Sequence, residues 1–128
     1  MDQKARRAAI MKALKAGGLK ARKGHLRLGV GELFWYVDVQ ADGPTPTAAL
    51  RLEVGCWLPS LTPEPEGGAV DCPLLADVPV GDDPAASAGG LVDLIAPVGS
   101  VGALRGLLAD GRLPGALVDR DLRALIEG

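Results

Sequence analysis

One stretch decides the fold: residues 49–58, which read ALRLEVGCWL. Every second side chain in it is apolar, in the order Leu50, Leu52, Val54, Cys56 and Leu58. Arg51, Glu53 and Trp57 fall on the opposite face. Because successive side chains of a strand point to opposite faces, this alternation predicts a β-strand with one buried face.

Two stretches upstream alternate in the same way, residues 25–30 and 33–40, and they are joined by a glycine-containing turn. Three sequential strands with short links predict an antiparallel meander. Farther along, Pro73 and Pro79 interrupt the apolar residues of 69–80, which predicts at best an edge strand or an extended cover. Residues 59–68 and 81–90 are expected to be loops.

Helical patterns lie on both sides of these strands. Residues 3–16 are rich in Ala, Lys and Arg, follow the capping residue Asp2 and end at a glycine pair. Shorter helices are expected at 91–96, after Ser100 and after Asp119. The sequence therefore predicts an α+β fold in one domain, residues 1–128. An N-terminal helix packs on an antiparallel β-meander sheet of three to five strands, followed by two or three short C-terminal helices.

Composition narrows the class of protein. No apolar run reaches the ~20 residues that a membrane-spanning helix needs, and no signal-peptide pattern follows the basic start. We therefore expect a cytoplasmic protein, and the residue usage suggests a bacterial one. Cys56 and Cys72 match neither a metal-binding nor a redox spacing, so buried, reduced thiols are expected, although one disulfide is geometrically possible.

Charge is distributed very unevenly along the chain. The first 27 residues hold nine basic residues and one acid, a formal charge of +8, whereas the remainder holds five basic and fifteen acidic residues, or −10. Such a segment could contact nucleic-acid phosphates, steer an acidic protein partner, or pair with the chain's own acids. The sequence pI of about 5.3 favours the second and third interpretations over nucleic acid.

No motif indicates catalysis, a metal site or a cofactor. His25 is the only histidine and has no cysteine near it in sequence, so neither a metal cluster nor a nucleophile–base pair is predicted. The pairs Glu64/Glu66 and Asp82/Asp83 lie in predicted loops, and Asp119/Asp121 fits helix capping. A helix start at Ser100 could hold an anion through its backbone amides, but capping explains the serine equally well.

The order of elements resembles that of a known family. Three stretches carry the resemblance: GLKARKGHLR at 18–27, VDVQ at 37–40 and LRLEVG at 50–55. The family is the mostly bacterial domain of unknown function 4304 family. In that family a basic, glycine-bounded stretch precedes the first strand. Leu19, Asp38 and Glu53 stand where the family has Phe, Asn and Asn. The resemblance implies a small α+β fold and carries over no catalytic residue. Some members look like partners or neutralising proteins of bacterial toxin systems.

These patterns together predict a non-enzymatic protein-interaction or ligand-binding domain. The alternative is a nucleic-acid accessory protein that uses residues 4–27. Phe34, Tyr36 and Trp57 are expected on the outer face of the sheet, where they either form an exposed aromatic patch or lie under the C-terminal helices. The candidate binding surface consists of seven residues: Lys20, Arg22, Lys23, Arg27, Phe34, Tyr36 and Trp57.

Overall fold

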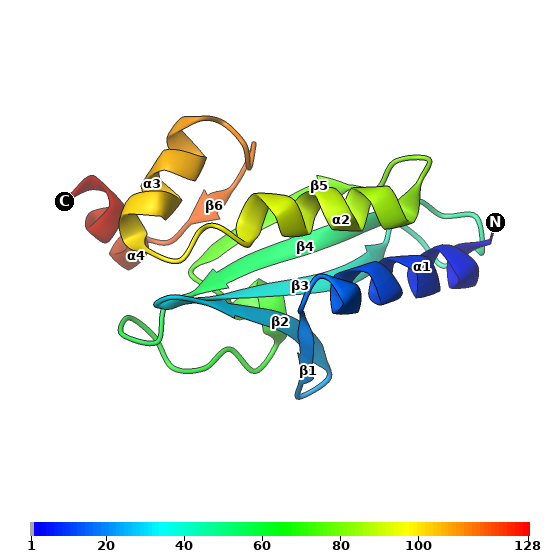
Figure 1. Cartoon of the computed structure of the whole chain (residues 1–128), viewed down its shortest axis with the longest axis horizontal. Helices are drawn as coiled ribbons and strands as arrows, with labels where there is room; N and C mark the ends of the chain where they lie inside the picture. Colours follow the sequence, from blue (N-terminus) through cyan, green and yellow to red (C-terminus); the bar gives the residue numbers. More distant parts are fainter. Residues whose placement is uncertain (1) are drawn as a thin grey trace.

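The computed structural model describes residues 2–128 and confirms the α+β fold with an antiparallel meander (Figure 1). Each strand pairs with the next strand along the chain, so the order across the sheet is also the order in sequence. The strands are β1 (Lys20–Arg22), β2 (His25–Val30), β3 (Leu33–Ala41), β4 (Leu50–Trp57), β5 (Leu74–Pro79) and β6 (Leu117–Val118).

The helices are α1 (Gln3–Ala16), α2 (Pro84–Ile95), α3 (Val101–Ala109) and α4 (Arg120–Glu127), with a 3-10 turn, η1 (Gly68–Asp71), before β5. Each α-helix is capped by a side chain that accepts a hydrogen bond from a first-turn amide; the caps are Asp2, Asp83, Ser100 and Asp119. A capping oxygen satisfies an amide that has no partner inside its helix. None of the helices in residues 2–128 combines the length and hydropathy needed to cross a bilayer.

Two expectations about the elements were wrong. Residues 84–90 are not loop but the first half of α2, which starts after the capping Asp83 with Pro84 at its first turn. The glycine pair Gly89-Gly90 argued against a helix here, because each glycine costs roughly 1 kcal/mol relative to alanine in a helix interior. Contacts between α1 and α2 stabilise the helix despite that cost, with the backbone of Gly17 lying against Val92.

The sheet also has more strands than expected. The basic turn forms β1, in which Lys20 pairs with Arg27 and Arg22 with His25. At the other edge, two-residue β6 pairs only with Leu74 and Leu75, so the rest of β5 is the open edge predicted from its prolines.

One face of the sheet carries the main core. Figure 1 shows α1 and α2 lying side by side across this face, with α3 and α4 at one end. Ile10 and Leu14 of α1 and Ile95 of α2 are fully buried against the alternating apolar residues of β3 and β4. Trp35 joins this core, and its indole Nε1 donates to Val98 O at 3.0 Å. Burial of this apolar surface is the main force that stabilises the fold.

The second face of the sheet is covered by its own loop, not by the C-terminal helices. Residues 58–73 leave β4, cross this face and place η1 against β3 and β4. Gly55 permits the close approach, because a Cβ there would lie 2.7 Å from both Ala69 O and Cys72 Sγ. We call residues 58–73 the covering loop.

Candidate functional site

The second face of the sheet carries a row of ionisable side chains. Cross-strand pairing aligns Arg22 with His25, and Asp38 with Glu53, which in turn pairs with Asp77. Residues paired across strands lie on the same face of a sheet, with Cβ atoms about 5 Å apart. The row is therefore basic at the β1 end and acidic from β3 to β5.

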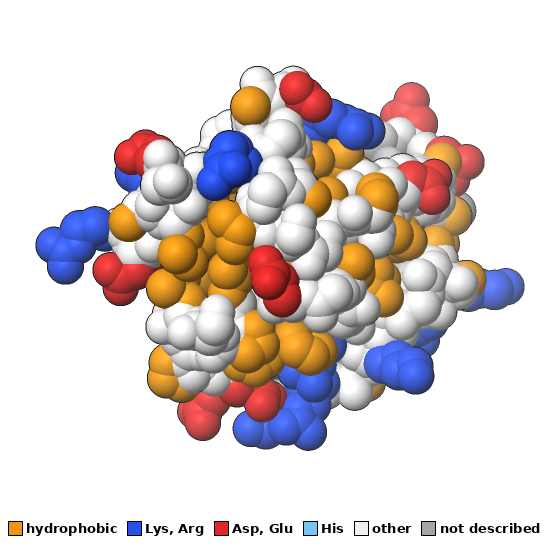
Figure 2. Space-filling view, turned by 60° about the vertical axis from the view of Figure 1, so that its left-hand side comes forward, with side chains coloured by type: hydrophobic (Ala, Val, Ile, Leu, Met, Phe, Trp, Pro, Cys, Tyr) orange, Lys and Arg blue, Asp and Glu red, His pale blue; other side chains and the backbone are white. Residues whose placement is uncertain are grey.

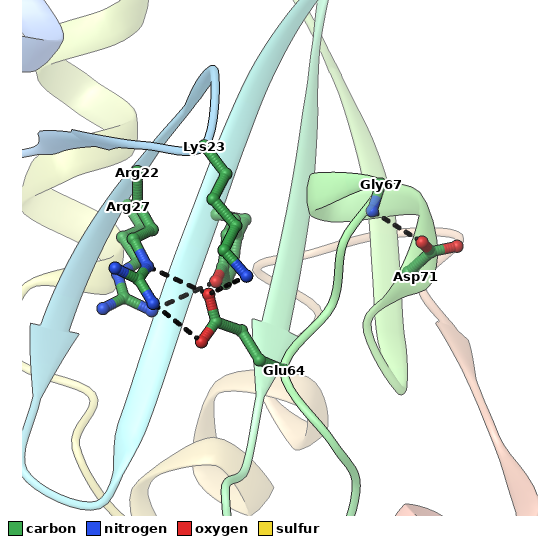
Figure 3. A network of polar contacts seen from close by, with 7 residues as sticks. Arg22, Lys23, Arg27, Glu64, Gly67 and Asp71 are labelled. Carbon is green, nitrogen blue, oxygen red and sulfur yellow. Dashed lines mark hydrogen bonds and ion pairs between the residues drawn. The ribbon is translucent and has the colours of Figure 1, made fainter.

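Figure 3 shows the basic end, where Arg22, Lys23 and Arg27 of the β1–β2 hairpin gather around Glu64 of the covering loop. Arg22 makes a two-pronged contact, with its Nε donating to Glu64 Oε1 at 3.0 Å and its Nη2 to Oε2 at 3.2 Å. Lys23 Nζ lies 3.7 Å from Glu64 Oε1. The hydrogen bond from Arg22 and the nearby positive charges lower the pKa of Glu64, and the same bond raises the pKa of Arg22.

The four cations of the β1–β2 hairpin outnumber the acids that meet them. Within residues 2–128, no carboxylate lies within 4.0 Å of the Lys20 ammonium or the Arg27 guanidinium, so Glu64 alone opposes four positive charges. Arg27 instead donates to the Tyr36 hydroxyl at 3.2 Å and lies 4.4 Å from the centre of the Phe34 ring. This position is a cation–π contact, which holds the guanidinium in place without neutralising it.

Phe34 is fixed from three sides. Its ring centre lies 5.2 Å from that of Trp57, and a Cβ on the facing Gly29 would come within 3.1 Å of the ring. Gly29 thus makes room for the ring beside β2, while Arg27 lies over it. The aromatic ring and the cation form a pre-ordered pair, which reduces the entropy lost on binding.

A groove of about 470 Å³ opens beside this pair, at the sheet edge where β1 begins and β2 extends past it. Its lining includes Gly18, Lys20, Arg22, Arg27, Gly29 and Phe34. We call it the basic groove. Four of the seven residues predicted for the binding surface therefore meet in one place: Lys20, Arg22, Arg27 and Phe34.

Neither arrangement expected for the outer aromatic residues, an exposed patch or cover by the C-terminal helices, was correct. Tyr36 is 1% exposed and Trp57 8%, because the covering loop packs on both through Ala69 and Cys72. The Trp57 indole Nε1 donates to Thr62 O of that loop at 3.0 Å. The sequence correctly placed both side chains on the second face of the sheet. They are almost fully buried, and they contact the groove residues Arg27 and Phe34. Lys23 lies outside the groove, at the hairpin turn.

Sequence reasoning left out several residues that organise this face. Asp38 holds two elements at once, since its Oδ1 accepts from His25 Nδ1 at 2.8 Å and its Oδ2 from Ala69 N at 2.9 Å. Gly68 fits beside that pair with a positive φ of 74°. The spacing of Asp38, His25 and Gly68 in the sequence did not indicate these contacts, because the loop brings together residues that are far apart along the chain.

Comparison of the chain with protein-family models, with curated proteins and with solved structures finds no match.

Both cysteines are free and buried. Burial, together with the charges of Asp38 and Asp71, raises the pKa of Cys72 to about 12, and burial also raises the pKa of Cys56. Both thiols therefore stay protonated at neutral pH, the form that is not nucleophilic. Across residues 2–128 no three His, Cys, Asp or Glu side chains lie together as metal ligands would.

Two further sites are candidates for a ligand: the start of α3 and a cavity beside α3 and α4. The first is already occupied by an acid of the chain, and the second contains none of the predicted residues. The amide of Val101 at the start of α3 donates to Glu32 Oε1 at 2.9 Å, so this helix end already holds an acid from the chain. A cavity of about 530 Å³ lies between α3, α4 and residues 111–118. Figure 2 shows that end of the molecule, where hydrophobic side chains gather between separated charged ones.

Proposed function

We propose that this domain is a non-enzymatic binding module that recognises an acidic segment of a partner protein through the basic groove. The observation that carries the proposal is the charge surplus on the β1–β2 hairpin. Among residues 2–128, Glu64 is the single carboxylate that forms an ion pair with any of the hairpin's four cations, and it pairs with only two of them, Arg22 and Lys23. Lys20 and Arg27, which line the groove, thus have positive charges left for an acid from outside.

The chain's own covering loop supplies an example of how such an acid would dock. Glu64 lies between Pro63 and Pro65, and its carboxylate engages the fork of Arg22 donors. Prolines favour an extended chain, so the contact resembles an acidic peptide laid along the hairpin. A partner segment would place further carboxylates beside it, on Lys20 and Arg27.

The resemblance to the domain of unknown function 4304 family belongs to this proposal, because residues 18–27, one of the three stretches that carry it, build one wall of the groove. A role as a partner protein in a bacterial system would agree with that resemblance. Cytoplasmic location and bacterial origin stay predictions from composition.

Binding of a fluorescein-labelled oligoglutamate peptide, followed by fluorescence anisotropy at an ionic strength of about 0.15 M, tests the proposal. We expect the double variant Lys20→Gln/Arg27→Gln to weaken binding by about tenfold or more, since ~1.4 kcal/mol of lost charge pairing corresponds to a factor of ten. The matched control is Lys12→Gln/Lys15→Gln, which removes the same charge from exposed positions of α1. It should keep affinity within about twofold, because exposed charges outside the contact are largely screened by salt.

Equal losses in the two double variants would contradict the proposal, since they would show attraction to net charge rather than to the groove. Duplex DNA serves as the competing probe. If DNA binds more tightly than the peptide and both double variants weaken it, the nucleic-acid function expected of residues 4–27 would replace the present one.

A further inference from the structure

A second pocket, unrelated to the basic groove, lies at the opposite end of β2. There β3 runs past the start of β2, and the gap at the sheet edge is closed by α1 on one side and the covering loop on the other. The cavity measures about 320 Å³ and is lined by residues from α1, β2, β3, β4 and the loop. We call it the edge pocket. Its size is at the lower end of small-molecule sites, which run from about 300 to 1,000 Å³.

The wall formed by the sheet is acidic. Asp38 and Glu53 pair across β3 and β4 on the second face, and both line the edge pocket. Asp38 is already held by His25 and Ala69 through one hydrogen bond to each oxygen. Its position is therefore set before any ligand arrives.

Glu53 lacks such partners. It is 9% exposed, and its buried Oε1 accepts no hydrogen bond from any group in residues 2–128. The other oxygen, Oε2, lies 3.9 Å from Arg51 Nη2, which is beyond hydrogen-bond distance. A carboxylate taken out of water without donors is costly in free energy, so a donor group brought by a ligand is stabilising here. Glu53 lines the pocket, and the terminal torsion of its side chain is soft, so the carboxylate is free to turn toward a ligand donor.

The wall formed by α1 is basic. Arg7 reaches over the open edge of β3, where its Nη1 donates to Val39 O at 2.9 Å, and it lines the same pocket. Among the described residues no carboxylate forms an ion pair with Arg7, so Arg7 and Glu53 belong to one cavity without neutralising each other. Met11 of α1 and Val70 of the covering loop add apolar surface to the lining.

We propose that the edge pocket binds a small zwitterion of the α-amino acid class with an apolar side chain. The ligand ammonium would donate to Glu53 and Asp38, and the ligand carboxylate would accept from Arg7. The apolar side chain would lie against Met11 and Val70. Separated charges of opposite sign favour a zwitterion over a purely cationic or purely anionic molecule, because each mismatched group would meet a like charge. This site is independent of the function proposed for the basic groove.

Two-dimensional NMR of the full chain tests this with L-leucine, L-methionine and L-phenylalanine as probes. We expect at least one of them to shift the amide resonances of Leu26, Gln40 and Gly67, which line the pocket. The methyl ester and the N-acetyl derivative of that amino acid each lack one charge. Each should bind about tenfold more weakly or worse, a factor that corresponds to ~1.4 kcal/mol.

Matched variants locate the binding. Glu53→Gln and Arg7→Gln should each weaken binding of that amino acid by about tenfold or more. Asp77→Asn removes the charge of the neighbour on the other side of Glu53, and Lys4→Gln removes an exposed charge from α1; neither residue lines the pocket. Both controls should keep the wild-type affinity, and the NMR spectra report whether each variant is folded.

The proposal is overturned if none of the three amino acids shifts these resonances at millimolar concentration. It is also overturned if the ester or the N-acetyl derivative binds as tightly as the free amino acid, or if Asp77→Asn weakens binding as much as Glu53→Gln does.

Discussion

Gly68 is the residue on which the covering loop turns toward the sheet. Its φ of 74° lies in the left-handed region, and a Cβ there would collide with Asp38 Oδ2 and His25 Nδ1. We expect Gly68→Ala to destabilise the protein by about 2–4 kcal/mol, the sum of backbone strain and steric overlap. Chemical denaturation of the purified variant measures this loss.

A variant at Gly115 separates the cost of backbone strain from the cost of steric overlap. Its φ of 73° is nearly the same, but a Cβ added there would have no neighbouring atom within 4 Å. Gly115→Ala should therefore cost only the strain, about 1 kcal/mol. Equal losses for the two variants would mean that the contacts of Gly68 with Asp38 and His25 contribute nothing.

Glu64 makes one hydrogen-bonded contact of the covering loop pH-dependent. Its pKa is lowered in the folded protein by Arg22, so the contact stabilises the fold above the ordinary pKa of a glutamate and is lost as pH falls through the lowered value. An NMR titration of the Glu64 carboxyl carbon should show a midpoint below the ordinary value. Arg22→Gln should return that midpoint toward the ordinary value, whereas Arg51→Gln, which removes a distant cation, should leave it unchanged.

At the scale of elements, the covering loop shields the second face of the sheet from solvent. It packs η1 over Tyr36 and Trp57 and buries its own Cys72. This loop is held by a small apolar cluster, Ala69 and Cys72 against the sheet, and by polar contacts to Asp38 and Arg22. Segments stabilised in this way open more readily than a core does.

Thiol labelling measures whether the loop stays closed. With a pKa of about 12, Cys72 holds roughly a thousandfold less thiolate than a thiol of ordinary pKa near 9. Ellman's reagent at pH 8 should therefore label the native protein far more slowly than the unfolded chain. Gly55→Ala, whose new methyl group would meet Ala69 and Cys72, should speed labelling of Cys72.

Gly43→Ala is the control for this variant, because its nearest neighbour would lie at an ordinary 3.8 Å. It should leave the labelling rate unchanged. Rapid labelling of Cys72 in the unaltered native protein would show that the loop does not cover the second face in solution.

At the scale of the whole molecule, the strong positive charge of the first 27 residues divides among several sites. Arg7 lines the edge pocket, Arg22 and Lys23 meet Glu64, and Lys20 and Arg27 line the basic groove with Arg22. Lys12 and Lys15 remain exposed on α1. A charge count along the chain cannot separate these roles, because they depend on which side of the sheet each cation reaches.

Local pattern was sufficient for most of the secondary structure. The alternation in residues 49–58 predicted β4 and its two faces, and Asp2 with Gly17 predicted both ends of α1. It failed for the first half of α2, where Gly89 and Gly90 lower helix propensity and packing against α1 compensates. It also missed β1, a strand of three exposed residues that exists because β2 lies beside it.

The strands, the helix caps and the division of side chains between two faces follow from neighbours within a few positions, because backbone hydrogen bonding and side-chain alternation are local. What covers the second face does not follow from them. It rests on Ala69 N with Asp38, 31 positions apart, and on Glu64 with Arg22, 42 apart. The basic groove and the edge pocket lie where one strand extends past its neighbour, β2 past β1 and β3 past β2. Those offsets are set by the pairing of the strands in the assembled sheet.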